Sequence, residues 1–179
     1  MEKSSQPTRN WILWSIKSRL ARIGRQSDIH LSRNRHISSA DVEFPLTPVE
    51  GKFAKIGLPY VPVTLSYEGS FPVEDALIDS GADVTLLPMD IRKYLGVELD
   101  ESRSINIGSA GGGGFIAIPS KEKITFTIEK KGFRSIEWQG TPFFAPRQPV
   151  ILLGHYQCLD QLDICIKGRK KIISIEKAK

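Results

Sequence analysis

From residue 44 onward, apolar and polar positions follow the patterns of β-strands and turns rather than those of long helices. The segment Val61–Tyr67 alternates with a period of two residues, and so does Ile124–Ile128. Phe71–Ile78 is predicted to be the return strand of a hairpin. Val150–Leu153 is continuously apolar, which is typical of a strand buried on both faces. The pattern therefore predicts a mostly β domain.

Turn signals and short helical stretches separate these strands. Glu68–Ser70 predicts the hairpin turn between the first two strands. The other predicted elements are the legs of a hairpin at Ser104–Ile107 and Phe115–Ile118, helices at Met89–Leu95 and His155–Leu162, a loop at Pro142–Pro149, and terminal strands at Ile164–Ile166 and Ile172–Ile175.

The first 40 residues have a different character. They carry eight Lys or Arg residues against two acids, whereas the rest of the chain has one more acid than bases. Trp11–Gly24 has helical spacing with four aliphatic residues on one face, and residues 26–40 are polar without periodicity. We therefore predict a basic N-terminal extension at 1–40, formed by an amphipathic helix and a linker, and a folded domain at 41–179.

Several roles are open for this extension. Its helix is suited to packing on the domain or on a dimer mate, to contact with a membrane surface, or to organellar targeting. Removal of the extension by self-cleavage is a further alternative. The net charge of +5 comes from this segment and says nothing about the substrate of the folded domain, for which no nucleic-acid partner is expected. The alternative is that the extension itself is a membrane or nucleic-acid tether that the folded domain regulates. With two cysteines and no apolar run of bilayer length, the expected location is the cytoplasm.

The candidate chemistry lies in the run Ala76–Pro88. An apolar strand ends in Asp79-Ser80-Gly81 and leads into a second short apolar stretch. One carboxylate is thereby placed at a tight turn between aliphatic side chains, where its pKa depends strongly on its neighbours. Aspartic proteases activate water with such a carboxylate. An ordinary β-turn uses the same residue types, so further sequence motifs are needed to distinguish a catalytic carboxylate from an ordinary turn.

Two further blocks follow this one along the chain. After Leu77–Asp83 come Gly111–Ile116 and Val150–Gly154. The three blocks together resemble the retropepsin-like aspartic proteases, single-lobed relatives of pepsin that work as homodimers. The resemblance extends over roughly residues 55–176. It implies an all-β fold, a closed β-barrel or acid-protease lobe with one or two short helices.

The resemblance implies a role for each residue of the first block. Asp79 would be the catalytic residue, and Ser80 would form a hydrogen bond across the dimer. Gly81 would accept a hydrogen bond from the substrate backbone. Ala82 would line the cleft, and Asp83 would bind the substrate backbone near the cleft entrance.

The other two blocks would surround this loop. By resemblance, the second block forms the mobile tip of a flap that closes over the peptide, and the third supports the catalytic loop from below. The flap residues are Gly111, Gly112, Gly113 and Gly114, and the supporting residues are Leu153, Gly154 and His155.

The sequence departs from the family at His155, where relatives commonly carry Arg. A neutral histidine can form a hydrogen bond with Asp83 but cannot form a bidentate ion pair. We therefore expect a pH-dependent brace between His155 and Asp83. His155, Cys158 and Cys165 have the wrong spacing for a zinc knuckle, so no metal is expected.

The number of motifs predicts the oligomeric state. Asp-Ser-Gly occurs once, and 179 residues do not hold two full lobes. A dyad of aspartates therefore needs Asp79 from each chain of a homodimer. The expected function is that of an aspartic endopeptidase, which hydrolyses peptide bonds of a protein or peptide by water activation without a cofactor. The alternative is a catalytically silent dimerisation or peptide-binding module with the same fold.

Overall fold

The computed structural model describes residues 41–108 and 113–178 of the chain. The predicted N-terminal extension, residues 1–40, lies outside the described residues. In the described part the chain consists mainly of β-strands, with one short α-helix and three short 3-10 helices, so the predicted all-β class is confirmed. No helix in this part is both long and apolar enough to cross a membrane.

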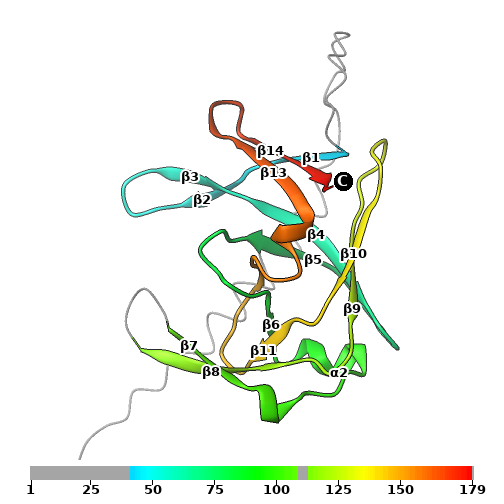
Figure 1. Cartoon of the computed structure of the whole chain (residues 1–179). Coiled ribbons are helices and arrows are strands. Elements are labelled where there is room, and N and C mark those ends of the chain that lie inside the picture. The colour runs from blue at the N-terminus through cyan, green and yellow to red at the C-terminus, as the bar shows by residue number, and fades with distance from the viewer. Residues whose placement is uncertain (1–40, 109–112, 179) are drawn as a thin grey trace, which may run out of the picture. The chain divides into compact units, whose positions relative to one another are not determined.

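The largest sheet in the described residues has nine strands (Figure 1). In spatial order they are β10 (Ile136–Gly140), β9 (Ile124–Ile128), β4 (Tyr60–Ser66), β5 (Ser70–Ile78), β12 (Ile151–Leu153), β6 (Leu86–Pro88), β11 (Phe143–Ala145), β8 (Gly114–Pro119) and β7 (Ile105–Gly108). Within the described residues β10 pairs only with β9, and β7 pairs only with β8. The sheet therefore has two free edges, and the expected closed barrel is wrong for this part of the chain.

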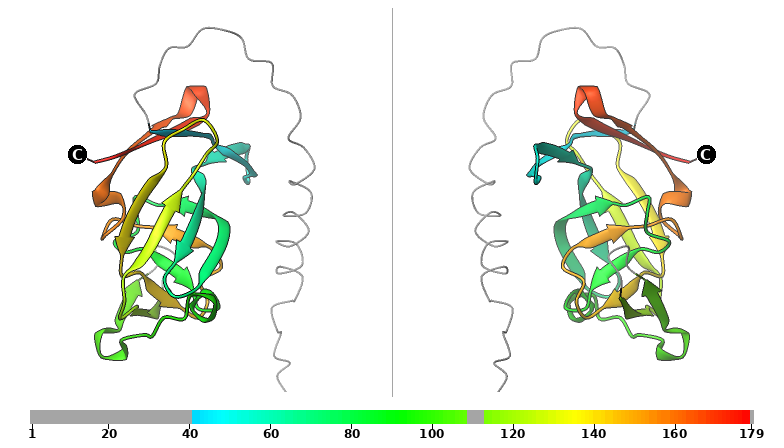
Figure 2. Two further views of the ribbon diagram at one scale, coloured as in Figure 1. Left: turned by 90° about the vertical axis from the view of Figure 1, so that its right-hand side faces the viewer. Right: turned by 90° about the vertical axis from the view of Figure 1, so that its left-hand side faces the viewer.

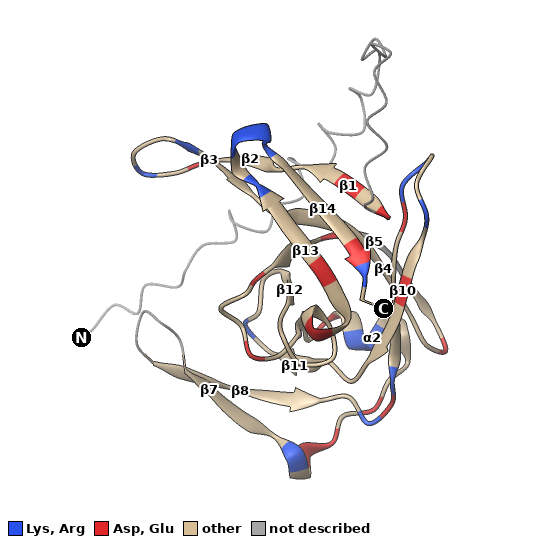
Figure 3. Cartoon of the chain, turned by 45° about the horizontal axis from the view of Figure 1, so that its top comes forward, with Lys and Arg blue, Asp and Glu red and all other residues tan. Residues whose placement is uncertain are grey.

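Two smaller sheets complete the described part. One contains β1 (Val42–Pro45), β14 (Ile172–Lys177) and β13 (Leu162–Lys167), and the other contains only β2 (Thr47–Glu50) and β3 (Lys55–Leu58). The three-stranded sheet lies at the opposite end from the β7–β8 hairpin (Figures 1 and 2). Basic residues gather at its β13–β14 turn (Figure 3).

The main core lies between the central strands and the three-stranded sheet. The alternation predicted in β4 is confirmed, because Val61, Val63 and Leu65 are fully buried. The rings of Phe126 on β9 and Trp138 on β10 stack with their centroids 5.2 Å apart. Burial of such large side chains is the main source of stability in a domain of this size.

Two predicted elements differ from the structure. The predicted helix at His155–Leu162 is only a 3-10 turn, η2 (Leu159–Gln161), because Gln157 adopts a left-handed φ of 59° that interrupts a helix. The predicted loop at Pro142–Pro149 contains strand β11. All three residues of β11 are buried, so this strand has no alternation that would reveal it.

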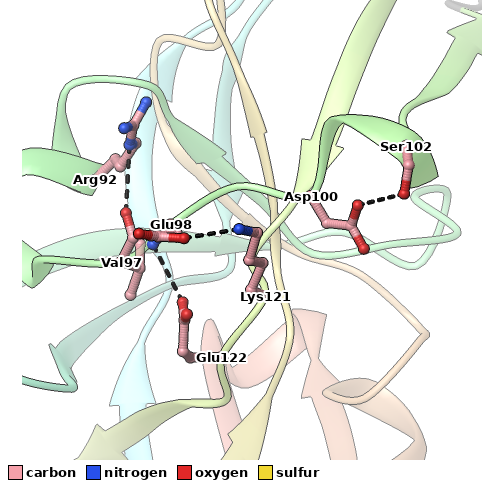
Figure 4. Close-up of polar contacts among 7 residues, drawn as sticks. All are labelled: Arg92, Val97, Glu98, Asp100, Ser102, Lys121 and Glu122. Atoms are coloured by element: carbon pink, nitrogen blue, oxygen red, sulfur yellow. Dashed lines mark hydrogen bonds and ion pairs between the residues drawn. The ribbon is translucent and has the colours of Figure 1, made fainter.

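The predicted helix at residues 89–95 is confirmed as α2 (Ile91–Leu95). Gly96 ends it with a φ of 71°, a conformation that glycine adopts without steric cost. The segment after the helix is tied down by polar contacts (Figure 4). Arg92 Nε donates to the carbonyl of Val97, and Lys121 Nζ lies 2.7 Å from Glu98 Oε2. This ion pair lowers the pKa of Glu98 and raises that of Lys121.

Candidate active site

The loop at residues 79–85 crosses the end of a strand. Strand β12 lies between β5 and β6, parallel to β5 and antiparallel to β6. Strand β5 therefore ends, and β6 begins, at the same end of β12. The chain can connect β5 to β6 only by passing over that end, beyond Leu153. The first and third sequence blocks thus lie against each other.

Backbone hydrogen bonds fix this crossing. The amide of Asp79 donates to the carbonyl of Leu153 at 3.0 Å. The amide of His155 donates to the carbonyl of Ala82 at 2.9 Å, and the amide of Tyr156 donates to that of Asp83 at 2.8 Å. Each bond closes a contact between segments about 70 residues apart in sequence, so the loop is held from both of its ends.

Gly154 allows the loop to lie this close. A Cβ atom at this position would lie 2.3 Å from the carbonyl oxygen of Val84 and 2.7 Å from that of Ala82. Only glycine avoids these clashes, since both neighbours are backbone atoms. The amide of Gly154 also donates to Oγ1 of the buried Thr85 at 3.3 Å.

Asp79 is half-buried at the start of the crossing. Its Oδ1 accepts a hydrogen bond from the amide of Gly81 at 2.9 Å, and its carbonyl accepts one from the amide of Ala82 at 3.1 Å. The other carboxylate oxygen, Oδ2, receives no hydrogen bond from the described residues. One oxygen is therefore oriented by the loop, while the other is available to an external group.

The remaining residues of the first block line the outer side of the loop. Ser80, Gly81 and Asp83 are exposed, and Ala82 is half-buried. All four lie within the same short crossing as Asp79. These residues are consecutive in the sequence, so the loop places them together, and the roles that the resemblance implies for them stay predictions.

The side chain of His155 contacts Ser80. Its Nε2 lies 3.0 Å from the carbonyl oxygen of Ser80 and donates to it, because a carbonyl oxygen can only accept. No hydrogen bond or ion pair in the described residues joins His155 to Asp83, so the expected partner is wrong. The carbonyl oxygen of Asp83 instead accepts a hydrogen bond from the amide of Tyr156, the residue that follows His155. A neutral imidazole already makes the Ser80 contact, so this contact does not require protonation.

Two of the predicted flap residues are described. Gly113 has a φ of 82°, and Gly114 begins β8, where it pairs with Gly108 of β7. Gly111 and Gly112 lie outside the described residues. The predicted hairpin is confirmed, and a residue with a side chain would be strained at Gly113.

A second apolar cluster connects the β7–β8 hairpin to the loop at residues 79–85. Its buried members are Leu86, Ala117, Phe143 and Ala145. Partly buried side chains pack against it from the loop, the β7–β8 hairpin and β12, namely Val84, Ile107, Phe115 and Leu152. The cluster thus places an incompletely buried apolar surface between the hairpin and the loop that carries Asp79.

Sequence reasoning missed Thr85 and Tyr156. Thr85 is buried, accepts the hydrogen bond from Gly154, and also bonds to the thiol of Cys158. Tyr156 forms a bridge with Val84 and is 48% exposed. The only available signal in the sequence was their position, because Thr85 and Tyr156 each lie two residues after the end of a block, the first and the third respectively.

Burial raises the pKa of the Cys158 thiol to about 12. Within the described residues, no group of three or more His, Cys, Asp or Glu side chains could hold a metal ion.

Comparison with known proteins finds no family model that matches the chain and no curated protein with a similar sequence.

Proposed function

We propose that this chain is an aspartic endopeptidase that acts as a homodimer, with Asp79 of each copy forming the catalytic dyad. The observation that carries the proposal is the geometry of the crossing loop. Asp79 is half-buried, its main chain is bonded to Leu153, and its Oδ1 is bonded to Gly81. A carboxylate fixed in this way does not need to reorganise when charge develops during reaction.

The chemistry follows from bringing two such carboxylates together. Two negative charges a few ångströms apart are costly, so the pair would share one proton and titrate as a unit. The ionised Asp79 would take a proton from water while the water oxygen attacks the peptide carbonyl carbon. The protonated partner would donate its proton to the carbonyl oxygen, giving a neutral tetrahedral diol. Proton transfer to the amide nitrogen then accompanies cleavage of the C–N bond.

The surrounding residues support a peptide substrate. The second apolar cluster, with its partly buried Val84 and Phe115, is suited to hydrophobic side chains next to the scissile bond. Exposed Gly81 and Asp83 offer a carbonyl acceptor and a carboxylate to an extended backbone. The β7–β8 hairpin would cover the peptide and exclude water.

Two apolar residues near the site do not belong to this surface. Ile151 is only 2% exposed and lies in the main core. Leu152, the next residue along β12, packs against the second cluster instead. Ile116 is 60% exposed, and its strand neighbours Phe115 and Ala117 belong to the second cluster, so it points to the other face of the hairpin.

The test is cleavage of an unbiased peptide library at several pH values by the wild type and by Asp79→Asn. The wild type should cleave, and the variant should lose at least about a thousandfold in rate, because an amide cannot act as the base. Circular dichroism checks that the variant is folded. Equal cleavage by both proteins would contradict the assignment of Asp79. A folded wild-type dimer that cleaves nothing would favour the silent binding module.

A further inference from the structure

The β2–β3 hairpin is a separate two-stranded sheet at the surface of the described part of the chain. In the described part of the chain, β2 and β3 pair only with each other, and no residue from 47 to 58 is buried. A two-stranded hairpin is marginally stable in water unless further strands or a packing surface support it. The hairpin projects from the body of the domain (Figures 1 and 2). The exposed faces of the hairpin are therefore open to a contact beyond the described residues.

The hairpin is amphipathic. Val49 and Ile56 are paired across the strands and lie on one face, while Glu50 and Lys55 are paired on the other. Glu50 and Lys55 form an exposed ion pair with an N–O distance of 3.0 Å. Ile56 on the apolar face is 49% exposed, and Phe53 in the turn is 93% exposed. The tip therefore offers two large apolar side chains that a protein contact would bury.

The base of the hairpin lies beside the catalytic loop. The amide of Ile78 donates to the carbonyl of Pro59 at 3.1 Å, and Ile78 directly precedes Asp79. Pro59 follows the last residue of β3. In a dimer that brings the two Asp79 loops together, a hairpin that starts this close to the loop lies next to the partner chain.

The charges of the hairpin are complementary to those around the loop. Lys52 lies in the turn, with its Nζ 5.5 Å from the centroid of the Phe53 ring, and Lys55 begins β3, where it pairs with Glu50. With two lysines and one glutamate, the hairpin has one excess positive charge. The loop end of the domain presents the exposed carboxylates of Asp83 and Asp160, together with the ring of Tyr156. The excess positive charge of the arm and these carboxylates attract each other.

We propose that the β2–β3 hairpin is a dimerisation arm whose tip, formed by Phe53 and Ile56, packs against the catalytic-loop end of a second copy of this chain. The inference rests on the proposed function, because the dyad requires that second copy. The arm then gives the dimer a contact surface outside the dyad itself. Because the interface is isologous, each chain provides one arm and receives one.

Sedimentation velocity on the full chain tests the arm. The Phe53→Ser/Ile56→Ser double variant should raise the dimer dissociation constant at least about tenfold, because it removes the two largest apolar contacts. The matched control is Tyr94→Ser on α2, an aromatic residue that is 62% exposed and far from the hairpin (Figure 1). This control should dissociate like the wild type. Circular dichroism verifies the fold of each variant.

The possible outcomes distinguish a failure of the arm proposal from a failure of the proposed dyad. If the wild type is dimeric and the double variant has the same dissociation constant, the proposal of a dimerisation arm is wrong, and the proposed function is unaffected. A wild type that remains monomeric at the highest concentration contradicts both. Amide hydrogen exchange gives a second measurement. Amides of residues 47–58 should exchange more slowly in the concentrated wild type than in a dilute, monomeric sample, and equal exchange would overturn the arm.

Discussion

At the scale of single residues, Asp79 is held by its own loop. Its Oδ1 and its main chain are bonded to Gly81, Ala82 and Leu153, so the orientation of the carboxylate follows from backbone geometry. The sequence predicts this loop well, because a carboxylate between apolar runs followed by glycine has few alternatives. It could not predict the contact of His155, since the choice between Ser80 and Asp83 depends on the three-dimensional path of the loop.

The two cysteines provide a prediction at this scale. Cys158 is buried with its pKa raised to about 12, whereas Cys165 on the edge strand β13 is exposed. A raised pKa keeps the Cys158 thiol protonated at neutral pH, and only the thiolate reacts with alkylating reagents. Iodoacetamide at pH 7.5 should therefore label about one thiol per folded chain.

Mass spectrometry of the labelled protein measures this outcome. In the Cys165→Ser variant, native labelling should disappear, and it should return when the protein is unfolded in urea. Rapid labelling of Cys158 in the native variant would show that the packing around Thr85 and Cys158 is wrong.

At the scale of elements, the central feature is the loop that crosses the end of β12. Alternation and apolar runs were sufficient to predict β4, β9 and β12, because each buries a regular set of side chains. Among the strands that the pattern did not predict are β11, β2 and β3. β11 is buried throughout, and β2 and β3 are stabilised by no core, so neither case produces a clear pattern in the sequence.

Gly154 tests this crossing directly. The substitution Gly154→Ala places a methyl group against the carbonyl oxygens of Val84 and Ala82, both of which are backbone atoms. We expect the free energy of unfolding to fall by at least about 2 kcal/mol, together with loss of peptide cleavage. Urea unfolding followed by tryptophan fluorescence measures the change.

The matched control is Gly168→Ala in the turn between β13 and β14. A Cβ at Gly168 would have no neighbour within 4 Å, so its effect should stay within about 0.5 kcal/mol. Equal stability of the two variants would mean that the loop does not lie over β12 as described.

At the scale of the whole molecule, the proposed dyad would need a second chain, because Asp-Ser-Gly occurs once in these 179 residues. The sequence could predict this requirement from the number of motifs alone. It could not predict which surfaces meet, because an interface depends on shapes and charges assembled from distant segments. The proposed contact between the β2–β3 hairpin and the loop end of the domain could be formulated only from the fold, because it joins segments that are distant in the sequence.

The most direct test of a shared dyad is a mixing experiment. Wild-type protein at a fixed concentration is equilibrated with increasing amounts of Asp79→Asn, and peptide cleavage per wild-type chain is measured. If each active site needs Asp79 from both copies, a ninefold excess of the variant should leave about one tenth of the activity, because most wild-type chains then pair with an inactive mate. Activity that stays constant at every ratio, with chain exchange demonstrated, would contradict the shared dyad.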